Sequence, residues 1–231
     1  DATDNGYARP IHGLIAHLDL TAGKVVHVED SGVIPIPPSS GRFDSAHQEK
    51  TRTDLKQLDI TQPEGASFTT EGYRVKWQGY DLRVSIHPVH GLVLHQMSLK
   101  GRPVLYRAAL SEMIVPYGDA DNMHSWKHVL DASEYNMGTL VNSLKLGCDC
   151  LGEIHYFDIH QVTWDGKAKT VENAICMHEE DYGIQWKHYD LLTKVSEVRR
   201  SRRLVISSIF TVGNYDYGFY WYLYLDGTIQ M

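Results

Sequence analysis

The sequence predicts a mostly-β protein built as a large antiparallel β-sandwich. Apolar and polar residues alternate along many short segments, turn signals separate these segments, and helical patterns are scarce. With 42% hydrophobic and 10% aromatic residues, the composition is that of an ordinary globular protein and excludes general disorder. Because a β-sheet of this kind buries one face against another layer, we expect two packed sheets.

The first strands are expected in residues 10–20 and 24–28, joined by a turn with Gly23 at the strained position. Residues 29–67 are rich in Pro, Ser, Gly and charged residues, which is typical of a long surface excursion. Strict alternation then predicts strands in residues 73–77 and 82–86, on either side of a turn at 78–80.

Residues 92–99 and 104–114 continue this meander, and residues 154–159 and 170–176 flank a further turn at Gly166. The most apolar strands are expected at 204–212 and 219–225. The second of these has no polar face, so we expect it to be covered on both sides. An Asp-Gly pair at 226–227 then predicts a returning strand. The best helix candidate, residues 124–130, is short.

Charge and hydropathy exclude several classes of protein. The formal net charge of −7 argues against nucleic acid as the main partner. No apolar run approaches the roughly 18 residues that a membrane-spanning helix needs. The only basic block, residues 199–203, directly precedes an apolar strand and is interpreted as a solvated segment or a subunit contact.

The 13 histidines raise the question of a metal site. His124 and His128 would share one face of a short helix, as in a zinc hydrolase, but no Glu lies between them and no third ligand is obvious. His155 and His160 would fall on opposite faces of a strand. We therefore interpret these histidines as surface or packing residues. The acidic run at 178–181 could hold a cation, but such runs are usually exposed loops.

The three cysteines do not form a zinc or redox motif, because Cys148 and Cys150 are separated by one residue rather than two. A bond between Cys150 and Cys176 would close a long loop and stabilise the fold by about 3.5 kcal/mol in the loop-entropy treatment. The spacing does not prove that bond, and an odd number of cysteines leaves at least one thiol over.

Two features point to chemistry. The sequence has 14 Tyr against 5 Phe, and residues 211–218 place a polar, glycine-containing break between two apolar strands. A β-bulge in a tyrosine-rich sheet would explain this break if it stood alone. The glycines would also let another group approach closely, and Asn214 and Asp216 could hydrogen-bond and orient whatever Tyr215 becomes.

Residues 211–217 (Thr-Val-Gly-Asn-Tyr-Asp-Tyr) resemble the Thr-x-x-Asn-Tyr-Asp/Glu-Tyr signature of the copper-containing amine oxidases. In that family, copper and oxygen convert the first Tyr into topaquinone. Residues 111–119, 147–154 and 178–183 resemble further blocks of the family, in the family's order. The resemblance covers nearly the whole chain and implies the β-sandwich of the family's catalytic domain.

The resemblance also implies roles for individual residues. Tyr215 would be the topaquinone precursor that carries the substrate as a Schiff base, and Asp131 would be the proton acceptor. Tyr117 would hydrogen-bond the cofactor's ring oxygen and Asn214 would help to orient the ring. Cys150 and Cys176 match the family's disulfide, which leaves Cys148 as the odd thiol. The residues expected to contact the substrate or gate its channel are Val129, Leu130, Val212, Gly213, Asp216 and Tyr217.

The implied activity is the oxidation of primary amines by O2 to aldehyde, ammonia and hydrogen peroxide, in a homodimer. The family binds copper through three histidines downstream of the quinone, and nothing follows Met231 here. We therefore expect residues 1–231 to be a truncated part of the catalytic β-sandwich, with the small N-terminal domains and the copper-ligand region outside it. Such a piece should be inactive by itself. A catalytically silent β-sandwich that binds or scaffolds is the alternative.

Overall fold

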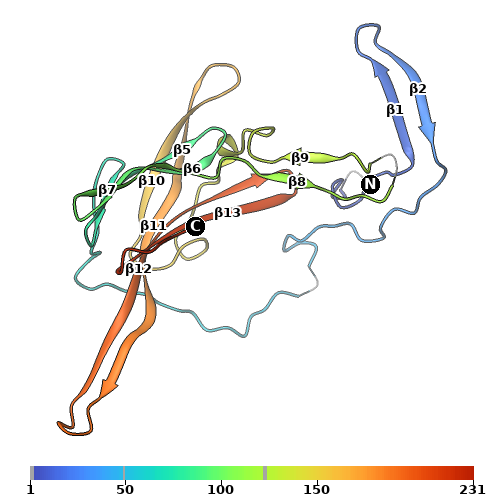
Figure 1. Ribbon diagram of the computed structural model, residues 1–231. Helices are drawn as coiled ribbons and strands as arrows, with labels where there is room; N and C mark the ends of the chain where they lie inside the picture. Colours follow the sequence, from blue (N-terminus) through green and yellow to red (C-terminus); the bar gives the residue numbers. More distant parts are fainter. Residues whose placement is uncertain (1–2, 49, 122–123) are drawn as a thin grey trace. The chain divides into compact units, whose positions relative to one another are not determined.

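The computed structural model describes residues 3–48, 50–121 and 124–231, and in these residues the protein is almost entirely antiparallel β-structure (Figure 1). The chain forms two compact units, the first from residues 1–57 and 116–128 and the second from residues 58–115 and 129–231. No helix in the described residues has the length and apolarity needed to cross a membrane. The predicted fold class is confirmed.

The first unit contains the predicted N-terminal hairpin. Its strands β1 (Leu14–Asp19) and β2 (Lys24–Asp30) pair antiparallel, and Gly23 adopts the left-handed conformation (φ 62°) that the turn requires. Between β2 and the next strand, the described residues of 31–68 form neither helix nor strand, whereas residues 29–30, where the predicted excursion begins, belong to β2.

The first five-stranded sheet of the second unit follows the predicted meander. Its strand order is β3-β4-β5-β6-β7, with every neighbouring pair antiparallel. The bounds are β3 Thr69–Glu71, β4 Arg74–Trp77, β5 Tyr80–His87, β6 Gly91–Leu99 and β7 Arg102–Ala108. Alternation decides which side chains face inward, since Val75, Trp77, Leu82 and Val84 are all buried.

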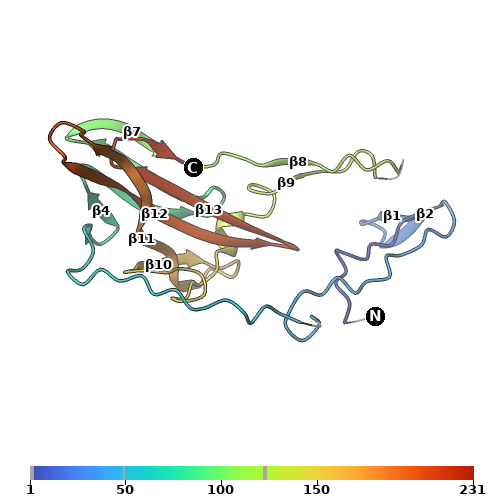
Figure 2. The same cartoon turned by 90° about the horizontal axis from the view of Figure 1, so that it is seen from below.

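The second sheet also has five strands, in the order β10-β11-β12-β13-β14. The bounds are β10 His155–Val162, β11 Ala168–Tyr189, β12 Ser196–Val212, β13 Tyr215–Tyr224 and β14 Ile229–Gln230. Figure 2 shows β12 and β13 running side by side along their length. The returning strand predicted after the Asp-Gly turn is β14, which pairs with Tyr222 and Leu223.

Strands β11 and β12 are much longer than predicted and form an arm that projects from the sheet (orange in Figure 1). The acidic run at 178–181 is therefore part of a strand, and its interpretation as an exposed loop was wrong. The basic block at 199–203 lies inside β12 rather than before it. The two blocks face each other across the ladder, where Asp181 pairs with Arg200 and Glu180 with Arg203. These cross-strand ion pairs help to stabilise the part of β11 and β12 that lies beyond the apolar pattern.

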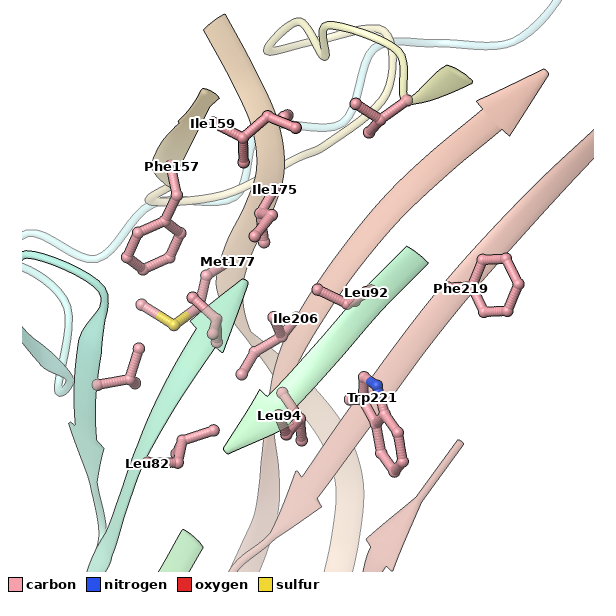
Figure 3. Close-up of a cluster of buried hydrophobic side chains, with 14 of the residues drawn as sticks. Leu82, Leu92, Leu94, Phe157, Ile159, Ile175, Met177, Ile206, Phe219 and Trp221 are labelled. Atoms are coloured by element: carbon pink, nitrogen blue, oxygen red, sulfur yellow. The ribbon is translucent and has the colours of Figure 1, made fainter. Parts of the chain in front are cut away.

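The hydrophobic core lies between the two sheets. Leu82, Leu92 and Leu94 of the first sheet point toward side chains of β10, β11, β12 and β13 in the second, as Figure 3 shows. The labelled partners from the second sheet are Phe157, Ile159, Ile175, Met177, Ile206, Phe219 and Trp221. This arrangement is the predicted sandwich.

The segment that links the two sheets differs from the prediction. Residues 124–130 were expected to be helical, but residues 124–126 form turns and β9 (His128–Leu130) is a strand that pairs with β8 (Ile114–Pro116). The one short helix in the described residues is a 3-10 turn, η1 (Met137–Leu140). His124 and His128 therefore do not share a helical face, which removes the basis of the zinc-hydrolase alternative.

The expectation that residues 219–225 are covered on both sides holds in part. Phe219, Trp221 and Leu223 are buried in the core and Tyr224 on the opposite face is buried as well, whereas Tyr220 on that face is 37% exposed. The phenol hydroxyl explains the difference, because tyrosine presents an apolar ring and a polar end that is satisfied by water.

Candidate active site

The site begins at the hairpin between β12 and β13. Over residues 203–224 the register of this pair runs without a shift to its last pair, Val212 with Tyr215. The predicted break is therefore a tight two-residue turn rather than a β-bulge, with Gly213 and Asn214 as the loop. Gly213 has φ 60°, a conformation that favours glycine and suits the turns that close such hairpins. The turn places Tyr215 at the start of β13.

A chain of polar contacts braces the hairpin just below this turn. The Asn142 side chain donates to Thr211 Oγ1 over 2.9 Å, and Thr211 Oγ1 donates to Asp216 Oδ1 over 2.7 Å. The Asn142 backbone amide also donates to the Ile209 carbonyl. Asp216, expected to lie near the substrate or to orient Tyr215, is thus engaged across the ladder with Thr211.

The ring of Tyr215 lies outside the core. Its side chain is 44% exposed, and its ring centroid is 6.3 Å from that of Tyr217, the next residue on the same face of β13. Tyr217, in contrast, is partly buried and packs against the main core cluster. In the described part of the chain the Tyr215 ring is therefore reachable from solvent and is held at the start of β13.

Asp131, the expected base, is only 2% exposed and accepts a hydrogen bond from the Tyr217 hydroxyl at Oδ2. Its backbone amide donates to the Met113 carbonyl over 3.0 Å. The structure therefore brings the buried carboxylate of Asp131 into contact with Tyr217, two positions after Tyr215. Sequence reasoning named Tyr217 as a substrate contact but did not identify it as the hydrogen-bond partner of Asp131.

Glu112 supports the turn that carries Asp131, and sequence reasoning missed it. Its Oε1 accepts from the backbone amides of Met113, Ala132 and Ser133, at 2.9, 3.2 and 3.3 Å. The hydrogen bond with the Ser133 side chain, joined by these amides, lowers the pKa of the Glu112 carboxyl against the opposing effect of burial. No sequence signal predicts such contacts, because they depend on how two distant segments meet.

The other expected substrate contacts divide into buried and exposed residues. Val129 and Val212 are buried, and Val212 belongs to the main core cluster, while Leu130 is 39% exposed. Leu130 is therefore the residue before Asp131 that faces outward. Gly213 and Asn214 lie in the exposed turn.

Tyr117 belongs to the first compact unit, so its expected hydrogen bond to the cofactor stays a prediction. Its backbone amide donates to the Lys127 carbonyl over 3.2 Å, and Lys127 Nζ lies 4.6 Å from the centroid of its ring. The ring is 39% exposed.

The disulfide implied by the family resemblance is present between Cys150 and Cys176, and it closes a loop with a sequence separation of 26. Cys148 remains an exposed free thiol. Both half-cystines are buried in a small cluster with Leu144, against which Ile209 of β12 packs. The bond therefore ties the loop before β10 to the centre of the second sheet.

The described part of the chain contains no group of three or more His, Cys, Asp or Glu side chains that could hold a metal ion. His155 and His160 lie on β10, where His155 contacts the rings of Phe68 and Phe157 and His160 is exposed. His178 lies beside Cys176 and Glu180 within β11. The residues present do not fit a copper ion, so we derive no step through copper.

Comparison with known proteins identifies the family of this chain. The family profile described as copper amine oxidase, enzyme domain, matches residues 69–231. A primary amine oxidase from Arthrobacter sp. (strain P1) is 54% identical over 234 residues, covering 100% of this chain and 36% of the relative. A histamine oxidase from Arthrobacter globiformis is 52% identical, covering 98% of this chain and 34% of the relative.

Among solved structures, the copper-containing benzylamine oxidase from Hansenula polymorpha superposes with a TM-score of 0.83 at 32% identity, covering 99% of this chain and 38% of that one. The chain thus spans roughly a third of the length of the curated relatives it matches. The family profile matches most of the chain and the sandwich fold is shared with a solved member, so the chain belongs to the copper amine oxidase family.

Proposed function

We propose that this chain carries the cofactor tyrosine and the base of a primary-amine oxidase. The reaction proposed for the whole protein is RCH2NH2 + O2 + H2O → RCHO + NH3 + H2O2, in which the amine loses two electrons and O2 gains them. Support comes from the family, whose relatives include primary amine oxidases, and from the placement of Asp131 and Tyr215.

The observation that carries the proposal is the hydrogen bond from Tyr217 to Asp131. Tyr215 and Tyr217 are two residues apart on one strand, so a carboxylate held by Tyr217 lies next to the strand that presents the Tyr215 ring. Few positions in a sandwich combine a buried carboxylate with an exposed ring in this way, since buried carboxylates usually pair with cations.

In the proposed reaction Asp131 accepts the proton that leaves the α-carbon of the bound amine. Burial keeps water from competing for the Asp131 carboxylate, and the Tyr217 hydroxyl fixes the direction of Oδ2. The strand position of Tyr215 and the braced turn below it hold the ring in one place relative to this base.

A quinone made from Tyr215 would supply the electron sink that no ordinary side chain provides. The exposed ring at the start of β13 fits a precursor that O2 and a metal must reach. Copper would have to be held by residues other than those described here. Tyr117 and Asn214 are proposed to orient the modified ring, and Leu130 to lie at the approach of the substrate.

We propose a homodimer as the working form. The outer half of the β11–β12 arm exposes large apolar side chains that the described part of this chain leaves uncovered. These are Ile184, Trp186, Leu191, Leu192, Val195 and Val198. A second copy of the chain is an occupant that would bury them.

The test uses Asp131→Asn and Tyr215→Phe in the full-length, copper-loaded protein. Asp131→Asn should still form a quinone that reacts with phenylhydrazine but should oxidise amines orders of magnitude more slowly, because the base is lost. Tyr215→Phe should lack both quinone and activity. In the mass spectrum, the wild-type peptide that contains Tyr215 should show a gain of oxygen and a loss of hydrogen.

Unmodified tyrosine in the wild-type, copper-loaded protein would contradict the proposal and favour a catalytically silent sandwich. Wild-type turnover by Asp131→Asn would show instead that another group is the base.

A further inference from the structure

We infer that Glu112 is a positioning residue for Asp131, which deepens the proposed function and rests on it. The two residues lie 19 positions apart in the sequence, and the Glu112 carboxylate contacts backbone amides of the turn that carries Asp131.

The need for such a residue follows from the local structure. Residues 131–136 form consecutive turns rather than a helix or strand, so the amides of Ala132 and Ser133 are not paired in a helix or a strand ladder. A single oxygen, Glu112 Oε1, accepts from the two amides that directly follow Asp131, at 3.2 and 3.3 Å. The same oxygen accepts from Met113, so it joins both segments.

A second contact fixes the turn on the other side of the aspartate. The Asp131 amide donates to the Met113 carbonyl over 3.0 Å. The peptide groups before and after the Asp131 Cα are thus both tied to residues 112–113. With its backbone fixed on both sides, the Asp131 side chain has few directions left, and the observed one leads to the Tyr217 hydroxyl.

The charge of Glu112 strengthens these contacts. Hydrogen bonds from amides to an ionised carboxylate are roughly twice as strong as those to a neutral acceptor. The lowered pKa of Glu112, caused first by its hydrogen bond with the Ser133 side chain, keeps this carboxylate ionised at neutral pH. Glu112 does not contact Asp131 through its side chain in any hydrogen bond of the described residues, so its effect acts through the turn.

The experiment compares Glu112→Ala, Glu112→Asp and Glu112→Gln in the full-length holoenzyme. Glu172→Ala, which removes an exposed carboxylate from β11, is the control. Three quantities are measured: hydrogen–deuterium exchange of the peptide that contains residues 131–136, in copper-free and copper-loaded protein; the quinone titre with phenylhydrazine; and kcat/KM per titrated quinone, with its isotope effect for an α-deuterated amine.

Glu112→Ala should speed exchange at the amides of 132 and 133 in both forms of the protein. Its kcat/KM per quinone should fall about 10- to 100-fold, the loss expected when a reacting group is displaced by roughly 1 Å. The isotope effect should stay at or above the wild-type value, because proton removal becomes the slower step. Glu112→Gln keeps an oxygen acceptor and should remain within about threefold of wild type, while Glu112→Asp, which shortens the reach, should lie between.

A purely structural role would lower the quinone titre of Glu112→Ala but leave kcat/KM per quinone unchanged, and that result would overturn the inference. Unchanged exchange at 132 and 133 would also overturn it. If Glu112→Ala does not fold, Glu112→Asp gives the same comparison. Absence of a quinone from the wild-type enzyme would refute the proposed function instead, while the exchange measurement would still report on the turn.

Discussion

Replacing Glu179 with alanine is expected to destabilise the sandwich by about 3–5 kcal/mol. Glu179 is only 4% exposed on β11, and its two carboxylate oxygens accept hydrogen bonds from three neutral donors in other parts of the second unit as well as from Arg202. The neutral donors are the Gln62 side chain at 2.7 Å, the Ser67 amide at 2.7 Å and the Trp77 indole at 2.9 Å. One carboxylate therefore joins the end of the long excursion to both sheets.

The size of this destabilisation follows from the hydrogen-bond donors that lose their acceptor when Glu179 is replaced by alanine. The Trp77 indole is 1% exposed, so water cannot replace its acceptor, and an unsatisfied buried donor costs about 1–3 kcal/mol. Gln62 and Ser67 are more exposed and can turn to water, so each adds only about 1 kcal/mol, the net value of an ordinary hydrogen bond. Arg202, 3.4 Å from the carboxylate, is 48% exposed and needs no replacement partner.

Thermal unfolding of the protein measures this loss. With about 2–4 °C per kcal/mol for a domain of 150–250 residues, Tm should fall by roughly 6–20 °C. Glu197→Ala is the matched control, because it removes a carboxylate from the same hairpin. Its ion pair with Arg199 is exposed on both sides and is worth at most about 1 kcal/mol.

The pH dependence of the stability provides a second test. Burial raises the pKa of Glu179, but the hydrogen bonds from Gln62, Ser67 and Trp77 and the charge of Arg202 outweigh burial, and the net pKa lies below 4.5. The unfolded chain therefore takes up this proton first as the pH falls. The stabilisation is complete above the ordinary glutamate pKa and is lost as the pH falls through the lower folded value. The Tm difference between wild type and Glu179→Ala should shrink below about pH 4.5. Equal Tm values for Glu179→Ala and Glu197→Ala at neutral pH would refute this reasoning.

Three further outcomes are expected. Tyr217→Phe removes the hydroxyl that donates to Asp131, so amine turnover per quinone should fall about 10-fold or more, and an unchanged rate would show that this hydrogen bond does not matter to the base. Gly213→Val forces a β-branched residue to φ 60°, which should lower the free energy of unfolding by about 1–3 kcal/mol and lower the quinone titre. Thermal unfolding measures the first effect, and a Tm equal to that of the wild type would mean that the turn adopts another form. Cys150→Ser should remove about 3.5 kcal/mol through its 26-residue separation, whereas Cys148→Ser, at an exposed free thiol, should leave Tm unchanged; equal shifts would contradict the observed pairing.

Much of the fold could be predicted from alternation and turn chemistry. The inward positions Val75, Trp77, Leu82 and Val84 follow a strict period of two, and the Asp-Gly turn at 226–227 leads to β14 as predicted. The outer halves of β11 and β12 could not be predicted in this way. Charged and apolar residues face each other there, as in Ile184 with Arg200 and Trp186 with Arg199, so the regular alternation ends although the hydrogen-bonded ladder continues.

The site was predictable only in part. Tyr215 and Asp131 came from the resemblance to a family, since nothing in the spacing of 84 positions indicates that their neighbourhoods meet. The Asp131–Tyr217 bond and the amide contacts of Glu112 required the folded chain. The helix expected at 124–130 is absent because β9 pairs with β8, and tertiary pairing of this kind overrides a short local pattern.

In the hairpin of β12 and β13, the main chain and the side chain of Tyr215 have different environments. Its main chain completes the ladder opposite Val212, while nearly half of its side-chain surface remains outside the packed interior. Oxygen atoms added to such a ring would enlarge it toward water and leave the neighbouring layers undisturbed. If Tyr215 is modified as proposed, the chain before and after modification should therefore share one architecture.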